Sequence, residues 1–144
     1  MVNEMSVKKK PFFDEKRDDE WRNRLSKLAY NVTRQGATER AFSGDLYAEN
    51  RDGDYHCVCC NHLLFTSEMK YESGCGWPSF HTEHPEAGIV RLEDYSHGMI
   101  RVEVRCQSCD AHLGHVFNDG PRENGGERYC INSVCLDFIM EESE

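Results

Sequence analysis

Eight cysteines in a chain of 144 residues constrain this protein more than any other feature of its sequence. Four of them form two C-x-x-C pairs, Cys57 with Cys60 and Cys106 with Cys109. Two such pairs can supply four thiolates to one tetrahedral Zn²⁺, because each pair wraps the ion in a tight turn. Four cysteine ligands leave no open coordination position. We therefore expect one structural Zn²⁺ per chain, which contributes folding free energy rather than chemistry.

Other uses of these four thiols stay open on spacing alone. Iron in the same cage is one alternative. Two disulfides, or free buried thiols, are others, although a C-x-x-C disulfide suits an oxidoreductase better than a structural role. Cys59 lies inside the first pair, whose spacing is already satisfied, and is expected to be a bystander.

Net charge and hydropathy argue against nucleic acid and membranes as partners of this protein. The formal net charge is −9, and this sign repels phosphate backbones and anionic lipids, so neither nucleic acid nor a membrane is an expected partner. No apolar stretch has the length of a membrane-spanning helix, and none follows the early lysines as in a signal peptide. We therefore expect a cytoplasmic protein, and in that reducing compartment cysteines serve metal binding or catalysis more often than structural disulfides.

The pattern along the chain predicts a polar N-terminal extension at 1–20, a single domain at 21–140 and an acidic tail at 141–144. Apolar residues from Trp21 to Ala29 recur at helical spacing, and the helical pattern stops at Gly36. Short strands are expected from Tyr55 onward, most clearly at 89–92 and 99–104, with another extended segment at 128–140. In the segment 99–104, apolar residues alternate with charged ones. The sequence predicts a mainly β, antiparallel domain with helices at its N-terminal end.

Cys130 is the first candidate nucleophile among the remaining thiols. If its segment is a strand, Arg128, Cys130 and Asn132 share one face. A guanidinium beside a thiol lowers its pKa, and the amide could orient whatever the thiol attacks. The alternative is a core cysteine on a strand, which is also the expectation for Cys135, an odd number of residues away.

His112 and His115 supply the residue type best suited to proton transfer near neutral pH. Asp119 could hydrogen-bond one of the imidazoles. A surface pair and a zinc ligand are the alternatives for these histidines. Cys75 lies in a glycine-rich turn that could bring a second thiol to the first, and Trp77 offers an aromatic wall for a thioether or methyl group, although a tryptophan in such a loop often only packs.

These segments together resemble the B-type methionine sulfoxide reductases. The resemblance extends from residue 30 to residue 138. Its specific parts are the two C-x-x-C pairs, the stretches Y-N-V-T-R-Q at 30–35 and T-E-R-A-F-S-G at 38–44, S-G-C-G-W-P-S-F at 73–80, H-L-G-H-V-F at 112–117 with Asp119 and Gly120, and R-Y-C-I-N-S at 128–133.

The resemblance implies two antiparallel sheets, called a β-tent, with the zinc away from the active site. It implies an enzyme that reduces methionine R-sulfoxide in peptides or proteins, with Cys130 as nucleophile and His115 as acid, His112 near it and Asp119 behind it. Arg128 and Asn132 would orient and polarise the substrate, and Trp77 would hold its ε-methyl group.

The same resemblance implies how the enzyme is recycled. Cys130 would become a sulfenic acid, Cys75 would condense with it to a disulfide, and thioredoxin would reduce that disulfide. Cys135 departs from the small apolar residues usual at its position, which leaves open a second resolving thiol.

Two other functions account for part of the sequence. A non-enzymatic zinc module that binds a protein partner explains the two C-x-x-C pairs but gives Cys75 and Cys130 no task. A hydrolase using Cys130 and His115 gives Cys75 no task either.

Overall fold

The computed structural model describes residues 15–141. The polar extension expected at 1–20 lies mostly outside this range. The acidic tail expected at 141–144 lies outside it except for Glu141.

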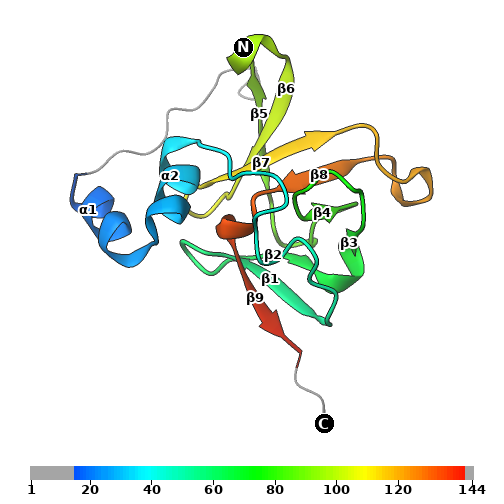
Figure 1. The fold of residues 1–144 in the computed structure, drawn as a ribbon, viewed down its shortest axis with the longest axis horizontal. Coiled ribbons are helices and arrows are strands. Elements are labelled where there is room, and N and C mark those ends of the chain that lie inside the picture. The colour runs from blue at the N-terminus through cyan, green and yellow to red at the C-terminus, as the bar shows by residue number, and fades with distance from the viewer. Residues whose placement is uncertain (1–14, 142–144) are drawn as a thin grey trace.

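Two antiparallel sheets form the body of the domain, as the sequence analysis expected (Figure 1). The first has three strands in the order β2-β1-β9, and the second has six in the order β3-β4-β8-β7-β6-β5. The strands are β1 Gly53–Cys57, β2 Leu63–Thr66, β3 Lys70–Tyr71, β4 Ser79–Phe80, β5 Val90–Asp94, β6 Arg101–Arg105, β7 His112–Phe117, β8 Arg128–Ile131 and β9 Leu136–Met140. Single 3₁₀ turns, η1 Ser67–Met69, η2 Ser96–Gly98, η3 Arg122–Asn124 and η4 Ser133–Cys135, connect some of them.

The expected helical segment is divided into two helices, α1 Glu15–Arg24 and α2 Lys27–Gln35. The division falls at Ser26, whose hydroxyl accepts a hydrogen bond from the Ala29 amide and so caps the start of α2. Gly36 ends α2 in the left-handed conformation, with φ of 77°, which glycine adopts without steric cost. Helix α2 packs on β7 and η4, and it therefore covers the strand that carries both histidines. Neither helix reaches the length and apolarity that crossing a bilayer requires.

The alternation expected at 99–104 is present in β6, but charged and apolar residues alike become buried toward the end of the strand, where Val104 is fully buried. Ile100 precedes the strand and is 81% exposed, whereas Glu103 is only 2% exposed and Arg105 is buried. Glu103 and Arg105 are buried because they pair with one another and with β7 beneath α2. Periodicity gives the face on which a residue lies, and the tertiary fold decides which face is covered.

The extended segment expected at 128–140 is two strands of different sheets, β8 and β9, separated by the turn η4. Asn132 therefore lies just beyond β8 rather than on the same strand face as Cys130. Cys135 lies in η4, is fully buried, and donates a hydrogen bond from its thiol to the His112 carbonyl at 3.2 Å. Its core position agrees with the expectation from the sequence.

Aromatic side chains join the two sheets. The ring of Phe65 from β2 stacks on Phe80 from β4, with ring centroids 4.0 Å apart, and Tyr55 from β1 meets Phe80 edge-on at 5.1 Å. These rings are fully buried, and each contributes about 1.5–3 kcal/mol of transfer free energy. This core fixes the angle between the sheets and thereby the position of β8 and β7.

Candidate active site and metal centre

The two C-x-x-C pairs form matching turns at the ends of two strands, which we call the first knuckle (residues 57–61) and the second knuckle (residues 106–110). In each, the amide four residues on donates to the carbonyl of the first cysteine at 2.8 Å, from Asn61 to Cys57 and from Asp110 to Cys106. Asn61 and Asp110 both adopt positive φ, at 67° and 64°. Asn and Asp tolerate this conformation better than other non-glycine residues.

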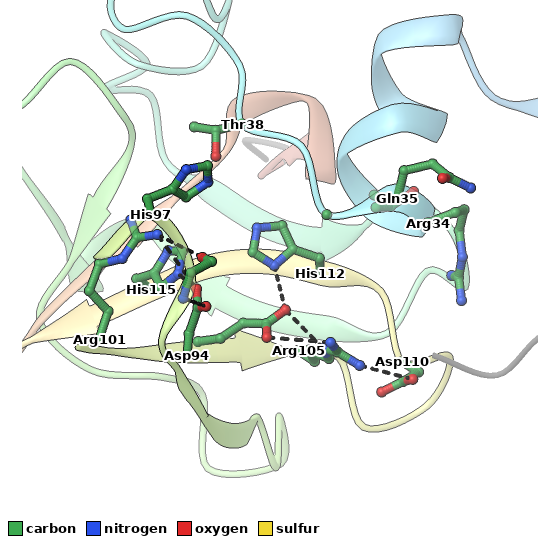
Figure 2. Close-up of a pocket in the computed structure, with 14 residues that line it drawn as sticks. Arg34, Gln35, Thr38, Asp94, His97, Arg101, Arg105, Asp110, His112 and His115 are labelled. Carbon is green, nitrogen blue, oxygen red and sulfur yellow. Dashed lines mark hydrogen bonds and ion pairs between the residues drawn. The ribbon is translucent and has the colours of Figure 1, made fainter. Parts of the chain in front are cut away.

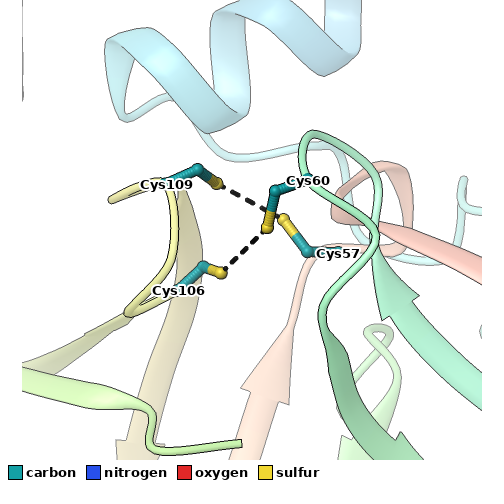
Figure 3. Close-up of side chains that lie close together, drawn as sticks. All are labelled: Cys57, Cys60, Cys106 and Cys109. Atoms are coloured by element: carbon teal, nitrogen blue, oxygen red, sulfur yellow. Dashed lines mark hydrogen bonds between the residues drawn. The ribbon is translucent and has the colours of Figure 1, made fainter.

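The knuckles come from different sheets and meet face to face (Figure 3). The Sγ atoms of Cys57 and Cys109 are 3.6 Å apart, those of Cys60 and Cys106 are 3.5 Å apart, and all four lie within 4.8 Å of one another. Zn–S bonds of about 2.3 Å in a tetrahedron place the sulfurs roughly 3.8 Å apart. The arrangement therefore fits a four-thiolate metal site.

The leading candidate nucleophile and its partner lie in a second cluster. Cys130 is on β8, and Cys75 is in the turn before β4, with 3.8 Å between their Sγ atoms. The hydroxyls of Ser73 and Ser79 lie 3.1 and 3.3 Å from the Cys75 sulfur. The pairing of β4 with β8 puts Ser79 opposite Cys130 and so holds the turn against that strand.

The pKa values of the two thiols are shifted in opposite directions. Burial, followed by the proximity of Cys75, raises the pKa of Cys130 to about 12, although Arg128 acts in the other direction. Burial by itself would raise the pKa of Cys75 too. Hydrogen bonds from Ser73 and Ser79 outweigh burial and leave the pKa of Cys75 below its ordinary value. In the reduced protein, Cys75 therefore gives up its proton more readily than Cys130 does.

A cavity of about 180 Å³ opens at the thiol pair. Six of the residues singled out in the sequence line it: Cys75, Trp77, His115, Arg128, Cys130 and Asn132. The tertiary fold thus gathers them from two strands, β7 and β8, and from the segments before β4 and after β8. His112 does not line this cavity, and neither does Asp119.

His112 and His115 line a neighbouring cavity of about 390 Å³, shown in Figure 2. His115 Nε2 lies 2.8 Å from Asp94 Oδ2, and His112 Nδ1 lies 2.6 Å from Glu103 Oε2. Burial lowers the pKa of His115, and the Asp94 carboxylate opposes this effect only in part. The imidazole of His115 is therefore neutral at pH 7, and its Nε2 proton points to Asp94.

Asp119 does not take the place expected for it behind an imidazole. Its carboxylate forms a bidentate pair with Arg128, with distances of 2.8 and 3.2 Å, and Arg128 lies over the Phe117 ring. Asp94, at the end of β5, is the carboxylate that holds His115. The sequence alone did not indicate this, because Asp94 and His115 are 21 residues apart and meet only through the register of three neighbouring strands.

Asn132 is buried and largely committed to the backbone. Its Oδ1 accepts from the Glu39 amide at 2.9 Å, and its Nδ2 donates to the Leu113 carbonyl at 3.0 Å, which leaves one N–H for a bound group. Trp77 is fixed in a similar way, since its indole N–H donates to the Glu39 carbonyl at 3.0 Å. The loop at Glu39 therefore positions two residues of the cavity.

Sequence reasoning also missed Thr38, Arg101, Gly114 and Phe117 in the cavity lining. Gly114 and Phe117 lie within the H-L-G-H-V-F motif. A Cβ on Gly114 would lie 2.0 Å from the Cys130 carbonyl, so only glycine allows β7 to approach β8 this closely. The position of Gly114 between the two histidines was the one sign in the sequence that this strand lies unusually close to a neighbour.

A family model described as the SelR domain matches residues 25–140 of the chain. Several curated bacterial proteins named "Peptide methionine sulfoxide reductase MsrB" are similar over most of the chain. One from Pseudomonas fluorescens (strain Pf0-1) is 56% identical over 128 residues, which cover 89% of this chain and 97% of that protein. One from Pseudomonas entomophila is 58% identical, covering 83% and 91%. One from Chromohalobacter salexigens is 52% identical, covering 86% and 93%.

Proposed function

This chain belongs to the SelR domain family of MsrB-type oxidoreductases, and from that premise we propose that it reduces methionine R-sulfoxide in peptides or proteins. The observation that carries the proposal is the pair of thiols 3.8 Å apart at the cavity that Trp77, His115 and Arg128 also line. A non-enzymatic zinc module has no use for that pair. A hydrolase has no use for the second thiol.

The first step transfers the sulfoxide oxygen to Cys130. The Cys130 sulfur attacks the sulfoxide sulfur and forms an S–S bond with it. The oxygen then passes to the Cys130 sulfur as this S–S bond and the sulfoxide S–O bond break, which leaves methionine and a Cys130 sulfenic acid. The thiol proton is the one that the transferred oxygen needs, so no outside proton is consumed.

His115 is well placed to move that proton. It lies directly opposite Cys130 in the register of β7 and β8, and both residues line the cavity. Its neutral imidazole can accept the thiol proton as the Cys130 sulfur attacks and pass that proton to the transferred oxygen. Asp94 fixes the tautomer of His115 by accepting a hydrogen bond from its Nε2–H. The ring centroid of His112, which Glu103 holds, is 5.6 Å from that of His115.

The second step uses the lowered pKa of Cys75. Its thiolate attacks the sulfenic sulfur, water leaves, and a Cys75–Cys130 disulfide forms. The disulfide requires the two sulfurs to approach from 3.8 Å to about 2.05 Å. A dithiol reductant of the thioredoxin type then regenerates both thiols.

The remaining polar groups bind and orient the substrate. Arg128, held by Asp119, and the free N–H of Asn132 face a polar sulfoxide, and Trp77 offers its ring to the ε-methyl group. The four cysteines of the knuckles hold one Zn²⁺, which ties the two sheets together and takes no part in the reaction.

A single-turnover experiment on reduced enzyme tests this function. Racemic N-acetylated methionine sulfoxide is added without reductant, and the epimers and the enzyme's disulfides are then analysed by chiral chromatography and mass spectrometry. We expect loss of the R epimer alone and one Cys75–Cys130 disulfide per methionine formed. Consumption of neither epimer by zinc-loaded enzyme would overturn the proposal.

A further inference from the structure

Two arginines from different helices lie against the same tryptophan. The guanidinium of Arg24, at the end of α1, is 4.8 Å from the ring centroid of Trp21, and that of Arg34, near the end of α2, is 4.7 Å from it. Trp21 is buried, although α1 is otherwise a strongly polar helix. Such cation–π contacts contribute about 0.5–2 kcal/mol each, more where the cation is desolvated.

The same two guanidiniums bind opposite knuckles. Arg24 Nη2 donates to the Cys59 carbonyl in the first knuckle at 2.5 Å, and Arg34 Nη2 donates to the Cys109 carbonyl in the second knuckle at 2.7 Å. The sequence separations are 35 and 75 residues. Figure 3 shows a pale blue helical ribbon above Cys109 and Cys60. The three side chains therefore connect both helices to both halves of the cysteine cluster.

Among the described residues, no carboxylate pairs directly with these arginines, although Arg34 is close enough to Asp18 to help lower the pKa of that carboxyl after the larger effects of Tyr30 and Arg22. Within residues 15–141, neither guanidinium forms a salt bridge, and Arg34 Nη1 is buried there with no hydrogen-bond partner. Four thiolates around a divalent cation leave a net charge of about −2. Two adjacent guanidiniums carry a charge equal in size and opposite in sign.

We propose that Trp21, Arg24 and Arg34 form a cationic clamp that neutralises the metal–thiolate centre and holds helices α1 and α2 on both knuckles. The clamp rests on the metal proposed for the four cysteines and is independent of sulfoxide reduction. Arg34 is half-buried and Arg24 is exposed, so Arg34 provides most of the effect.

Metal binding and helix docking are consequently coupled. Helices of ten and nine residues are too short to persist alone in water, so their order depends on such contacts. Without the metal, the cluster loses its fixed charge and the two knuckles lose their common centre. The clamp then has no fixed partner, and the helices become the first part of the molecule to open.

The rate of zinc release tests the clamp. Full-length, zinc-loaded protein is mixed with the chelating dye 4-(2-pyridylazo)resorcinol under native conditions, after its zinc content has been determined. Loss of a group that supports metal ligands from outside typically lowers metal affinity 10–100-fold. We expect Arg34→Met to release zinc at least tenfold faster than wild type. Arg34→Lys keeps the positive charge but lacks the planar guanidinium with its several N–H donors, so its release rate should lie between those of wild type and Arg34→Met.

Arg22→Met is the matched control. Arg22 also lies over an aromatic ring, that of Tyr30, and pairs with Asp18, and both of these contacts stay within the two helices. Its removal should leave zinc release unchanged. Hydrogen exchange of β7 amides, compared with that of 18–35, shows whether a faster release reflects opening of the helices or of the whole domain.

A spectroscopic measurement separates charge neutralisation from packing. With Co²⁺ in place of zinc, we expect the sulfur-to-cobalt charge-transfer band to shift in Arg34→Met and not in Arg22→Met. Equal release rates for these two variants, or an unmoved band, overturn the clamp. A purified chain that binds no zinc overturns both the clamp and the metal assignment, while the turnover assay still decides the enzymatic function.

Discussion

Glu103→Gln tests whether the buried charges beneath helix α2 stabilise the fold. Glu103 accepts from His112 at 2.6 Å and from Arg105 at 2.9 Å. Burial alone would raise its pKa, but these two partners outweigh burial and lower the pKa of Glu103 from 4.5 to about 2. At roughly 1.4 kcal/mol per pKa unit, this difference corresponds to about 3 kcal/mol of folding free energy at pH 7.

The sign of the pH dependence follows from the lowered pKa. The stabilisation is fully present above pH 4.5, the pKa of the unfolded chain, and is lost as the pH falls toward about 2. The difference in unfolding free energy between wild type and Glu103→Gln is therefore measured at pH 7, where the stabilisation is fully present. Urea unfolding at fixed zinc concentration measures it, and Glu123→Gln, at an exposed residue of η3, serves as the control with a change below about 0.5 kcal/mol.

A loss of less than about 1 kcal/mol for Glu103→Gln would refute this reasoning. It would mean that the cost of desolvating the charges cancels their attraction, as happens in some buried ion pairs.

Further predictions concern catalysis and the metal. Cys75→Ser should complete one turnover, stop with Cys130 as a sulfenic acid trapped by dimedone, and lose recycling by thioredoxin; full recycling would point to Cys135 or another resolver. Asp94→Asn should lower the single-turnover rate at least about 10²-fold and change its pH profile, because His115 loses the acceptor that fixes its tautomer, whereas Asp137→Asn on exposed β9 should not. Removing zinc with a chelator should lower the melting temperature by several degrees, and an unchanged value would argue against a structural metal.

The candidate site was predictable where chemistry is encoded in local spacing. Each C-x-x-C pair forms one turn, so its two thiols converge whatever surrounds them. The pairing of the two knuckles with each other is confirmed by the structure. The segments around Cys75 and Cys130 were recognisable as motifs, and the fold brings these two thiols to 3.8 Å. The roles assigned to them stay predictions.

The partners of the histidines were not predictable in the same way. Asp119 was the nearest carboxylate in sequence, but it pairs with Arg128, and Asp94 holds His115. The prediction from sequence took the carboxylate closest along the chain as the partner of the histidines. In an antiparallel sheet, neighbours are set by strand register, which depends on turn geometry and on the shared core.

The sequence by itself determined the antiparallel β class, the two knuckles and the residue types available for thiol chemistry, because each depends on short-range periodicity or spacing. Only the tertiary structure decided that Glu103 and Arg105 of β6 are buried, that the pKa of Cys130 is raised while that of Cys75 is lowered, and that Arg24 and Arg34 reach opposite knuckles. The physical reason is that burial and electrostatic environment arise from residues far apart in the chain, and their contacts exist only once the sheets and helices have packed.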